Sequence, residues 1–304
     1  MTETVTRMDE FENLKLNSLI GAPPEMKGSS LTISGKNNVL YCEDGVTIEN
    51  STIRFSGDNS IMVLGSSKHP YKLNATVYNN CSLLIGRNCY FNGPLNVIVS
   101  EEQDVVVGND CLISFGIWIR TADPHLIYDC ATCTRINPSR SIVVGDHVWI
   151  GQAATILKNT IIGSGSIIGA TSLVSGKRIP SNTSWGGNPA KQIRSGVFWD
   201  AACVHKYTQA DTISSTRKDG DFRIFKSGNA KHDIESILTY ASARKKGDVD
   251  ALTLATSFLV DTTKPTHASR IFVEEATRKN DKTRTRQWRF PTMVKNLLSK
   301  NSTR

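Results

Sequence analysis

Six aliphatic residues recur at intervals of six within residues 144–174, and this spacing restricts the fold more than any other feature of the sequence. An α-helix repeats about every 3.6 residues and a β-strand about every two, so neither produces a strict period of six. A parallel β-helix does, because each unit forms one short strand and a corner, with the aliphatic side chain inward and a glycine that leaves the backbone free to turn. The aliphatic positions are Val144, Ile150, Ile156, Ile162, Ile168 and Val174, and the glycines that follow four of them are Gly145, Gly151, Gly163 and Gly169.

The repeat extends towards the N-terminus in a less regular form. Short β segments over residues 31–64 are separated by Asn- and Gly-rich corners, which suits Asn because it tolerates the left-handed backbone conformation. An acidic insertion at residues 101–104 interrupts the spacing. We therefore expect β-helix coils over residues 31–194, preceded by an arm and linker over residues 1–30. The earlier positions that keep the spacing are Ile85, Phe91, Val97, Val107, Ile113 and Ile119.

The pattern becomes helical after residue 194. Asp248 is a candidate N-cap for a second helix, and Pro265 separates that helix from a third around Ile271. We predict a mainly helical C-terminal extension over residues 195–304. The first helix is expected from Ile234, Ile237, Leu238 and Ala241.

Residues 121–141 have no six-residue pattern, yet the repeat resumes in phase after them. A solenoid tolerates such an excursion only if the loop leaves the coil and returns to the same edge. Long loops of this kind usually carry function. Within the loop, Arg135 and Asn137 are suited either to fix its conformation or to contact an acidic sugar.

Four motifs together resemble the hexapeptide-repeat acyltransferases: TADPHLIYD (121–129), RIN (135–137), GDHVWIG (145–151) and GNPAK (187–191). They are most similar to the O-acetyltransferases that modify bacterial surface polysaccharides and sialic acids, and the match covers residues 85–194. The resemblance implies a left-handed parallel β-helix with three strands per coil. It also implies a homotrimer whose active site lies between two subunits.

His125 precedes Trp149 by 24 residues, the separation that this family shows between its catalytic His and the Trp of its VWIG motif. The resemblance implies that His125 is the general base for an acceptor hydroxyl, a task for which imidazole titrates in the right pH range. Trp149 would lie beside the acetyl group and pantetheine arm, although packing alone also explains it. Asp123 or Asp129, or a backbone carbonyl, could stabilise the imidazolium.

The donor implied by the resemblance is acetyl-CoA, with no metal. Its pantetheine arm would lie in the groove between neighbouring β-helices, and its phosphates need cations. The segment VSGKRIP has one residue more than the family's VTKDIP, so Arg178 is an alternative to Lys177. The positions carried over are Gln152, Ala170 and Ser175 for the arm and Lys177, Lys191 and Arg194 for the phosphates.

Composition indicates a globular protein, with 39% hydrophobic and 21% charged residues. Residues 1–10 lack the apolar core of a signal peptide, and no long apolar run follows, so we expect the cytoplasm. An odd number of cysteines, seven, favours free thiols. Cys130 and Cys133 form a CxxC motif, which is compatible with a zinc or redox role. The alternative is that they are ordinary loop thiols.

The net charge of +8 is concentrated in residues 278–304, which contain nine basic residues and one acidic residue. Such a segment suits a membrane surface or an anionic polymer, or is simply solvated. Nucleic acid is disfavoured because aromatic residues are sparse there.

Taken together, the sequence predicts an acetyl-CoA-dependent O-acetyltransferase that acts on a hydroxyl of a capsule, O-antigen or sialic acid type of polysaccharide. Direct transfer in a ternary complex, with His125 as base, is the expected mechanism. One alternative is another acceptor, such as serine, an amino sugar or an antibiotic. The other is a non-catalytic β-helix that acts as a scaffold or glycan-binding module.

Overall fold

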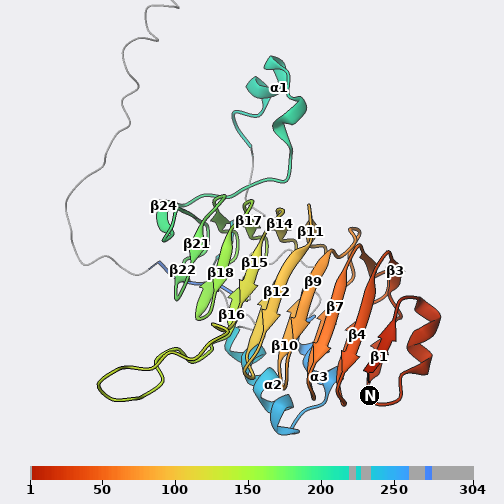
Figure 1. Cartoon of the computed structure of the whole chain (residues 1–304). Coiled ribbons are helices and arrows are strands. Elements are labelled where there is room, and N and C mark those ends of the chain that lie inside the picture. The colour runs from red at the N-terminus through yellow and green to blue at the C-terminus, as the bar shows by residue number, and fades with distance from the viewer. Residues whose placement is uncertain (1, 219–223, 227–233, 260–270, 276–304) are drawn as a thin grey trace, which may run out of the picture.

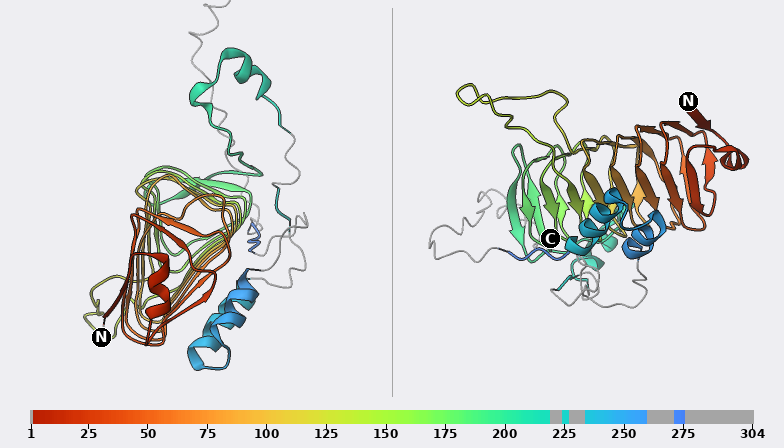
Figure 2. Two further views of the ribbon diagram at one scale, coloured as in Figure 1. Left: turned by 90° about the vertical axis from the view of Figure 1, so that its right-hand side faces the viewer. Right: turned by 90° about the horizontal axis from the view of Figure 1, so that it is seen from below.

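A computed structural model of the chain describes residues 2–218, 224–226, 234–259 and 271–275. The chain winds into a parallel β-helix, as predicted, and from β9 to β20 each coil adds one strand to each of three sheets. Seen along its axis, the β-helix is a triangular prism (Figure 2, left). The basic segment 278–304 lies outside the described residues.

The three faces of the prism are three sheets. Along the chain, a coil passes through the first sheet, then the second and then the third, as in β15, β16 and β17. The first sheet contains β1 (Thr2–Val5), β4 (Ser30–Ser34), β7 (Thr52–Ser56), β9 (Leu73–Val77), β12 (Leu95–Val99), β15 (Trp118–Arg120), β18 (Thr155–Leu157) and β21 (Leu173–Val174). The second sheet contains β2 (Ser18–Gly21), β5 (Val39–Cys42), β8 (Ile61–Leu64), β10 (Ser82–Ile85), β13 (Asp104–Val107), β16 (Ile142–Val144), β19 (Thr160–Ile162) and β22 (Arg178–Ile179). The third sheet contains β11 (Tyr90–Phe91), β14 (Leu112–Ile113), β17 (Trp149–Ile150), β20 (Ile167–Ile168), β23 (Thr183–Gly186) and β24 (Lys191–Ser195).

Two short strands and five helical segments complete the described structure. The strands β3 (Glu25–Lys27) and β6 (Thr47–Glu49) pair with each other. The helical segments are η1 (Met8–Asn13), η2 (Val204–Lys206), α1 (Gln209–Ser214), α2 (Ile234–Lys246) and α3 (Ala251–Phe258). No helix among the described residues is long and apolar enough to cross a membrane.

The core is a stack of aliphatic side chains along the prism axis. All six positions of the six-residue period over residues 144–174 are fully buried, which confirms that they point inward. In the first sheet Leu31 pairs with Ile53, Ile53 with Ala75, and Ala75 with Val97. These partners are 22 residues apart, whereas Ile156 and Val174 in the last coils are 18 apart. The early coils are therefore longer than three hexapeptides, which is why the period slips there.

The glycines of the repeat serve a different purpose from the one expected. Gly145 is absent from the residues with positive φ, so it does not supply a left-handed turn. A Cβ at Gly145 would lie 2.5 Å from the Ser164 backbone nitrogen in the next coil. Glycine is needed because adjacent coils approach too closely for a side chain. The left-handed corners are instead taken by other residues, among them Asn37 and Asn59.

The β-helix begins earlier than residue 31. Ser18 to Gly21 of β2 pair in parallel with Val39 to Cys42 of β5. The segment expected to be a linker thus supplies strands of the first coil, and β1 pairs antiparallel with β4 beside it. The runs Ser18–Gly21 and Glu25–Lys27 are therefore strands, whereas Phe11 is buried in the short helix η1.

The C-terminal helices α2 and α3 cover the outer face of the second sheet (Figure 2). Ile237 and Phe258 pack against outward side chains of this sheet such as Ile61, so the sheet is buried on both faces. The expected N-cap Asp248 is wrong: Asp250 caps α3, accepting a hydrogen bond of 2.7 Å from the Thr253 amide.

The third predicted helix is also wrong for the described residues 271–275, which are not helical. Ile271 accepts a 3.0 Å hydrogen bond from the Ser164 amide, and Val273 accepts one of 2.9 Å from the Ser181 amide. The apolar spacing there reflects docking onto the last coils in an extended conformation.

Candidate active site

The loop of residues 121–141 leaves the prism between β15 of the first sheet and β16 of the second. We call this corner the 1–2 edge. Thr121 is fully buried at the base of the loop, where its hydroxyl accepts a 2.9 Å hydrogen bond from the Ser100 amide. The Arg140 amide donates to the Thr121 carbonyl at 3.1 Å, so the two ends of the loop meet. The coil continues in register on either side, as an excursion loop requires.

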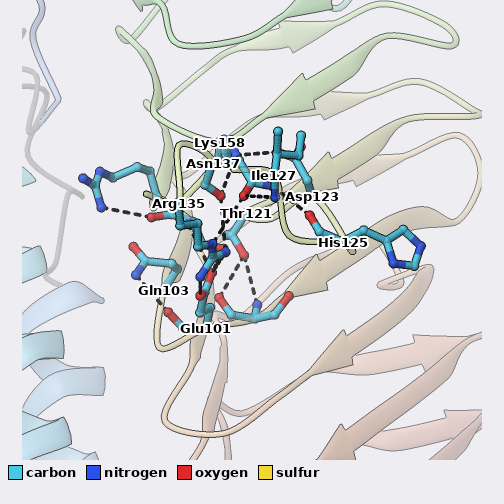
Figure 3. A network of polar contacts seen from close by, with 12 residues as sticks. Glu101, Gln103, Thr121, Asp123, His125, Ile127, Arg135, Asn137 and Lys158 are labelled. Atoms are coloured by element: carbon cyan, nitrogen blue, oxygen red, sulfur yellow. Dashed lines mark hydrogen bonds and ion pairs between the residues drawn. The ribbon is translucent and has the colours of Figure 1, made fainter. Parts of the chain in front are cut away.

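Asn137 holds the loop together from within (Figure 3). Its side chain is 6% exposed, and its Nδ2 donates to the His125 carbonyl at 2.8 Å and to Asp123 Oδ2 at 3.2 Å. Its Oδ1 accepts from the Ile127 amide at 2.9 Å and from Arg135 Nε at 3.3 Å. One buried amide therefore fixes the backbone on both sides of residue 126, directly where His125 lies.

Lys158 connects this cluster to the next coil. Its Nζ donates to Asp123 Oδ2 at 2.6 Å and to the Asn137 carbonyl at 3.1 Å. The hydrogen bond from Lys158 holds the pKa of Asp123 below its usual value, so this carboxylate is ionised at neutral pH. Sequence reasoning missed Lys158, because a lysine at a coil corner has no motif that reveals a partner 35 residues away.

A second ion pair anchors the returning half of the loop. Arg135 pairs with Glu101, which also accepts a hydrogen bond from the Ser139 hydroxyl. Hydrogen bonds from Arg135 and Ser139 lower the pKa of Glu101 to about 2. Glu101 belongs to the acidic insertion between β12 and β13, so this insertion anchors the returning half of the loop. Arg135 and Asn137 are thus placed in contacts that fix the loop, one of the two roles expected of them.

His125 itself is exposed, and its ring is directed away from the network (Figure 3). Within the part of the chain that the structure describes, its imidazole makes no hydrogen bond or ion pair. Asp123 is occupied by Lys158 and Asn137, and Asp129 accepts from the backbone and hydroxyl of Thr132. Neither of the carboxylates predicted to support the imidazole contacts it in this chain, because both are used to shape the loop.

Trp149 lies on the outer face of the third sheet, where it is 39% exposed. The third sheet, which carries Trp149, is the face of the prism opposite the 1–2 edge, from which the loop with His125 leaves. The two residues therefore lie on different sides of one chain. A single protomer therefore does not bring them into one cleft. Trp149 instead faces Trp199, with 6.1 Å between the ring centroids.

The residues expected to bind the donor fall into two groups. Gln152 and Ala170 are exposed at the corner between the third and first sheets, where the Thr171 amide donates to the Gln152 carbonyl at 2.7 Å. Lys191 is close to the same corner, since the Ala190 amide donates to the Leu173 carbonyl at 2.8 Å. The second group lies elsewhere. Ser175, Lys177 and Arg178 follow β21 at the 1–2 edge, and Arg194 lies on β24 opposite Ser184. One protomer does not join the two groups into one site.

The known proteins that this chain matches agree with this architecture. The family described as "Bacterial transferase hexapeptide (six repeats)" matches residues 141–176. The polysialic acid O-acetyltransferase of Neisseria meningitidis is 31% identical over 147 residues, which are 48% of this chain and 65% of that protein. The polysialic acid O-acetyltransferase of Escherichia coli O1:K1 / APEC is 34% identical over 117 residues, 38% of each chain. The match therefore spans less than two thirds of the length of these relatives.

Among solved structures, that of the polySia specific acetyltransferase NeuO superposes with a TM-score of 0.57 and 27% identity. The superposition covers 65% of this chain and 92% of that chain. The coil architecture, the repeat and the relatives agree with one another. The chain has the fold of a left-handed parallel β-helix, its residues 141–176 match the hexapeptide-repeat family, and it resembles the polysialic acid O-acetyltransferases.

Proposed function

We propose that this chain transfers an acetyl group from acetyl-CoA to a hydroxyl of a bacterial surface polysaccharide of the capsule, O-antigen or sialic acid type. The relatives named as polysialic acid O-acetyltransferases support the acceptor class. The observation that carries the proposal is the presentation of His125: an exposed imidazole on a loop whose backbone is fixed on both sides by Asn137.

In the mechanism we favour, His125 accepts the proton of the acceptor hydroxyl as its oxygen attacks the thioester carbonyl. The C–S bond then breaks, and CoA leaves as a thiol after taking up the proton. The tetrahedral intermediate needs a hydrogen-bond donor for its oxyanion, and the Trp149 indole is a candidate. No acyl-enzyme forms, because the two substrates react directly.

The separation of His125 and Trp149 within one chain favours a site shared between copies. In a cyclic assembly, one protomer supplies the loop and its neighbour the third sheet, and the same pairing repeats at every interface until the ring closes. A homotrimer is the assembly we propose. The donor would then lie between neighbours, with Gln152, Ala170 and Lys191 on one side.

The test of the activity is release of CoA thiol from acetyl-CoA with and without a panel of bacterial polysaccharides. We expect acceptor-dependent release that is lost in His125→Ala, with the circular dichroism spectrum and oligomeric state unchanged. Release that persists in the variant would exclude His125 as the base. A chain that neither turns over nor binds acetyl-CoA would be a scaffold instead.

The shared site is tested by mixing two variants. His125→Ala and Trp149→Ala are each expected to be impaired at least tenfold. Co-refolded at equal amounts, they form trimers in which about a quarter of the interfaces combine an intact His125 with an intact Trp149. We expect activity to recover to about that fraction of wild type. No recovery would mean that both residues act within one chain.

A further inference from the structure

A cavity of about 980 Å³ lies on the third sheet, next to Trp149. Strands β11 and β14 form its floor, and the segment that follows β24 forms its other wall. The lining combines aromatic rings with amide, carboxyl and imidazole groups. The lining includes Tyr90, Asn92, Asp110, His147, Trp199 and Phe225.

The cavity and Trp149 share one row of outward side chains. Tyr90 pairs with Leu112, and Leu112 pairs with Trp149. The next residue of each strand points into the core, as the buried Phe91 shows. Neighbouring strands lie about 4.8 Å apart, so Tyr90 is about 10 Å from Trp149 along the same face. A group bound at Tyr90 therefore lies on the same face as the Trp149 side chain, two strands away.

The wall formed by the C-terminal segment is fixed in place. The Trp199 ring stacks on the His147 ring, with 4.0 Å between centroids and 5° between planes. Trp199 Nε1 donates to the His147 carbonyl at 2.9 Å, and a His147 ring nitrogen lies 3.2 Å from the Trp199 carbonyl oxygen. Trp199 is 7% exposed. The cavity is thus a built feature of this chain, and its wall comes from residues beyond those that resemble the family.

We infer that this cavity is the acceptor subsite of the proposed transferase and holds one ring of an acidic polysaccharide. The inference rests on the proposed function. Tyr90 is 43% exposed and offers the apolar face of a sugar an aromatic platform. Asn88 and Asn92 carry amides that both donate and accept, which suits hydroxyl groups. Lys68 at the rim supplies a cation for the sugar carboxylate.

The same lining argues against the donor. A CoA molecule brings several phosphates, whereas one acidic sugar ring brings a single carboxylate. The described lining contains one lysine, three histidines and the carboxylate of Asp110, which fits the smaller charge. Its volume is within the range of small-molecule pockets, of about 300–1,000 Å³. The exposed positions Gln152 and Ala170 lie at the corner beyond Trp149, outside the cavity. Trp149 therefore separates an acceptor region from the proposed donor region, as a transfer reaction requires.

The experiment compares Tyr90→Ala with Tyr78→Ala in the full chain. Tyr78 is 40% exposed and does not line the cavity, so it controls for the loss of a surface tyrosine. With a sialic acid oligomer as acceptor, we expect Tyr90→Ala to raise the acceptor KM about tenfold while the acetyl-CoA KM is unchanged. Tyr90→Phe keeps the ring and should behave like wild type, as should Tyr78→Ala.

Three outcomes would overturn the inference: an unchanged acceptor KM in Tyr90→Ala, a rise in the acetyl-CoA KM instead, or loss of the oligomer, which would make this face an interface. Binding of the sialic acid oligomer without acetyl-CoA, followed by tryptophan fluorescence, separates this inference from the proposed function. Binding that depends on Tyr90 in a chain without transferase activity would uphold the subsite and refute the activity. Acetyl transfer in a chain whose oligomer binding does not depend on Tyr90 would uphold the activity and refute the subsite.

Discussion

Substitution of Asn137 by alanine tests whether the excursion loop is organised around one buried amide. Asn137→Ala removes four hydrogen bonds. Two of them are short: the one donated to the His125 carbonyl, at 2.8 Å, and the one accepted from the Ile127 amide, at 2.9 Å. The other two are longer, at 3.2 and 3.3 Å. Each good hydrogen bond contributes roughly 0.5–1.5 kcal/mol net, so the ordered loop should lose about 2–3 kcal/mol relative to its open forms.

The effect should be local, because the loop lies outside the prism and contributes little to the core. We expect amide hydrogen exchange at Ile136, which donates to the Ile127 carbonyl at 2.9 Å, to accelerate roughly 30- to 160-fold. On the proposed function, kcat/KM should fall at least about tenfold, since His125 loses its position. The melting temperature should change little.

Asn38→Ala is the matched control. Asn38 is fully buried in a coil, where its Nδ2 donates to Asn17 Oδ1 at 3.0 Å and to the Gly57 carbonyl at 2.8 Å. This variant should lower the melting temperature and leave loop exchange and kcat/KM unchanged. Normal exchange at Ile136 in Asn137→Ala, or equal effects of the two variants on activity, would refute the reasoning.

Three further predictions concern the scaffold. The pKa of Glu101 is lower in the folded than in the unfolded state, so Glu101 stabilises the loop above a pH of about 4.5. This stabilisation is lost as the pH falls towards about 2. Glu101→Gln should abolish this pH dependence, measured as hydrogen exchange of the loop amides. Gly145→Ala should lower the free energy of unfolding by several kcal/mol, because its Cβ would lie 2.5 Å from a backbone nitrogen of the next coil; Gly45→Ala, where φ is +77° and no atom lies within 4 Å, should cost only about 1 kcal/mol in chemical denaturation. Lys245→Met leaves the buried Asp104 carboxylate without its 2.8 Å partner and should destabilise docking of α2 by about 3–5 kcal/mol. Proteolysis of the helix should then be faster. Resistance to proteolysis equal to that of wild type would refute this pairing.

The sequence was sufficient to predict the coils, because their signal is local. An inward aliphatic and a glycine recur within each unit of six, so no knowledge of a distant partner is needed. The irregular early coils were harder to read for the same reason. Leu31 and Ile53 stack although they are 22 residues apart, and a coil of that length contains corners that do not repeat every six residues.

The contacts that shape the candidate site could not be read in this way. Lys158 and Asp123 are 35 residues apart, and Arg135 and Glu101 are 34 apart. Each pair meets only because the excursion returns to the edge it left, so that residues of successive coils become neighbours. Trp199 is a further example, since nothing in its own segment indicates that it stacks on a corner histidine of an earlier coil.

The rigidity of the prism determines how a site on this scaffold can be completed. His125 is four residues beyond the buried Thr121, so an extended backbone carries it at most about 14 Å from the coil. The contacts of Asn137 and Lys158 hold it on its own side of the prism, away from the third sheet. A coil cannot bend to close that distance, because β15 and β16, which flank the loop in sequence, and β17, which carries Trp149, are each paired with strands on both sides. On the proposed function, His125 and Trp149 would therefore meet only across two copies, and the contacts within each loop would set the geometry of that shared site.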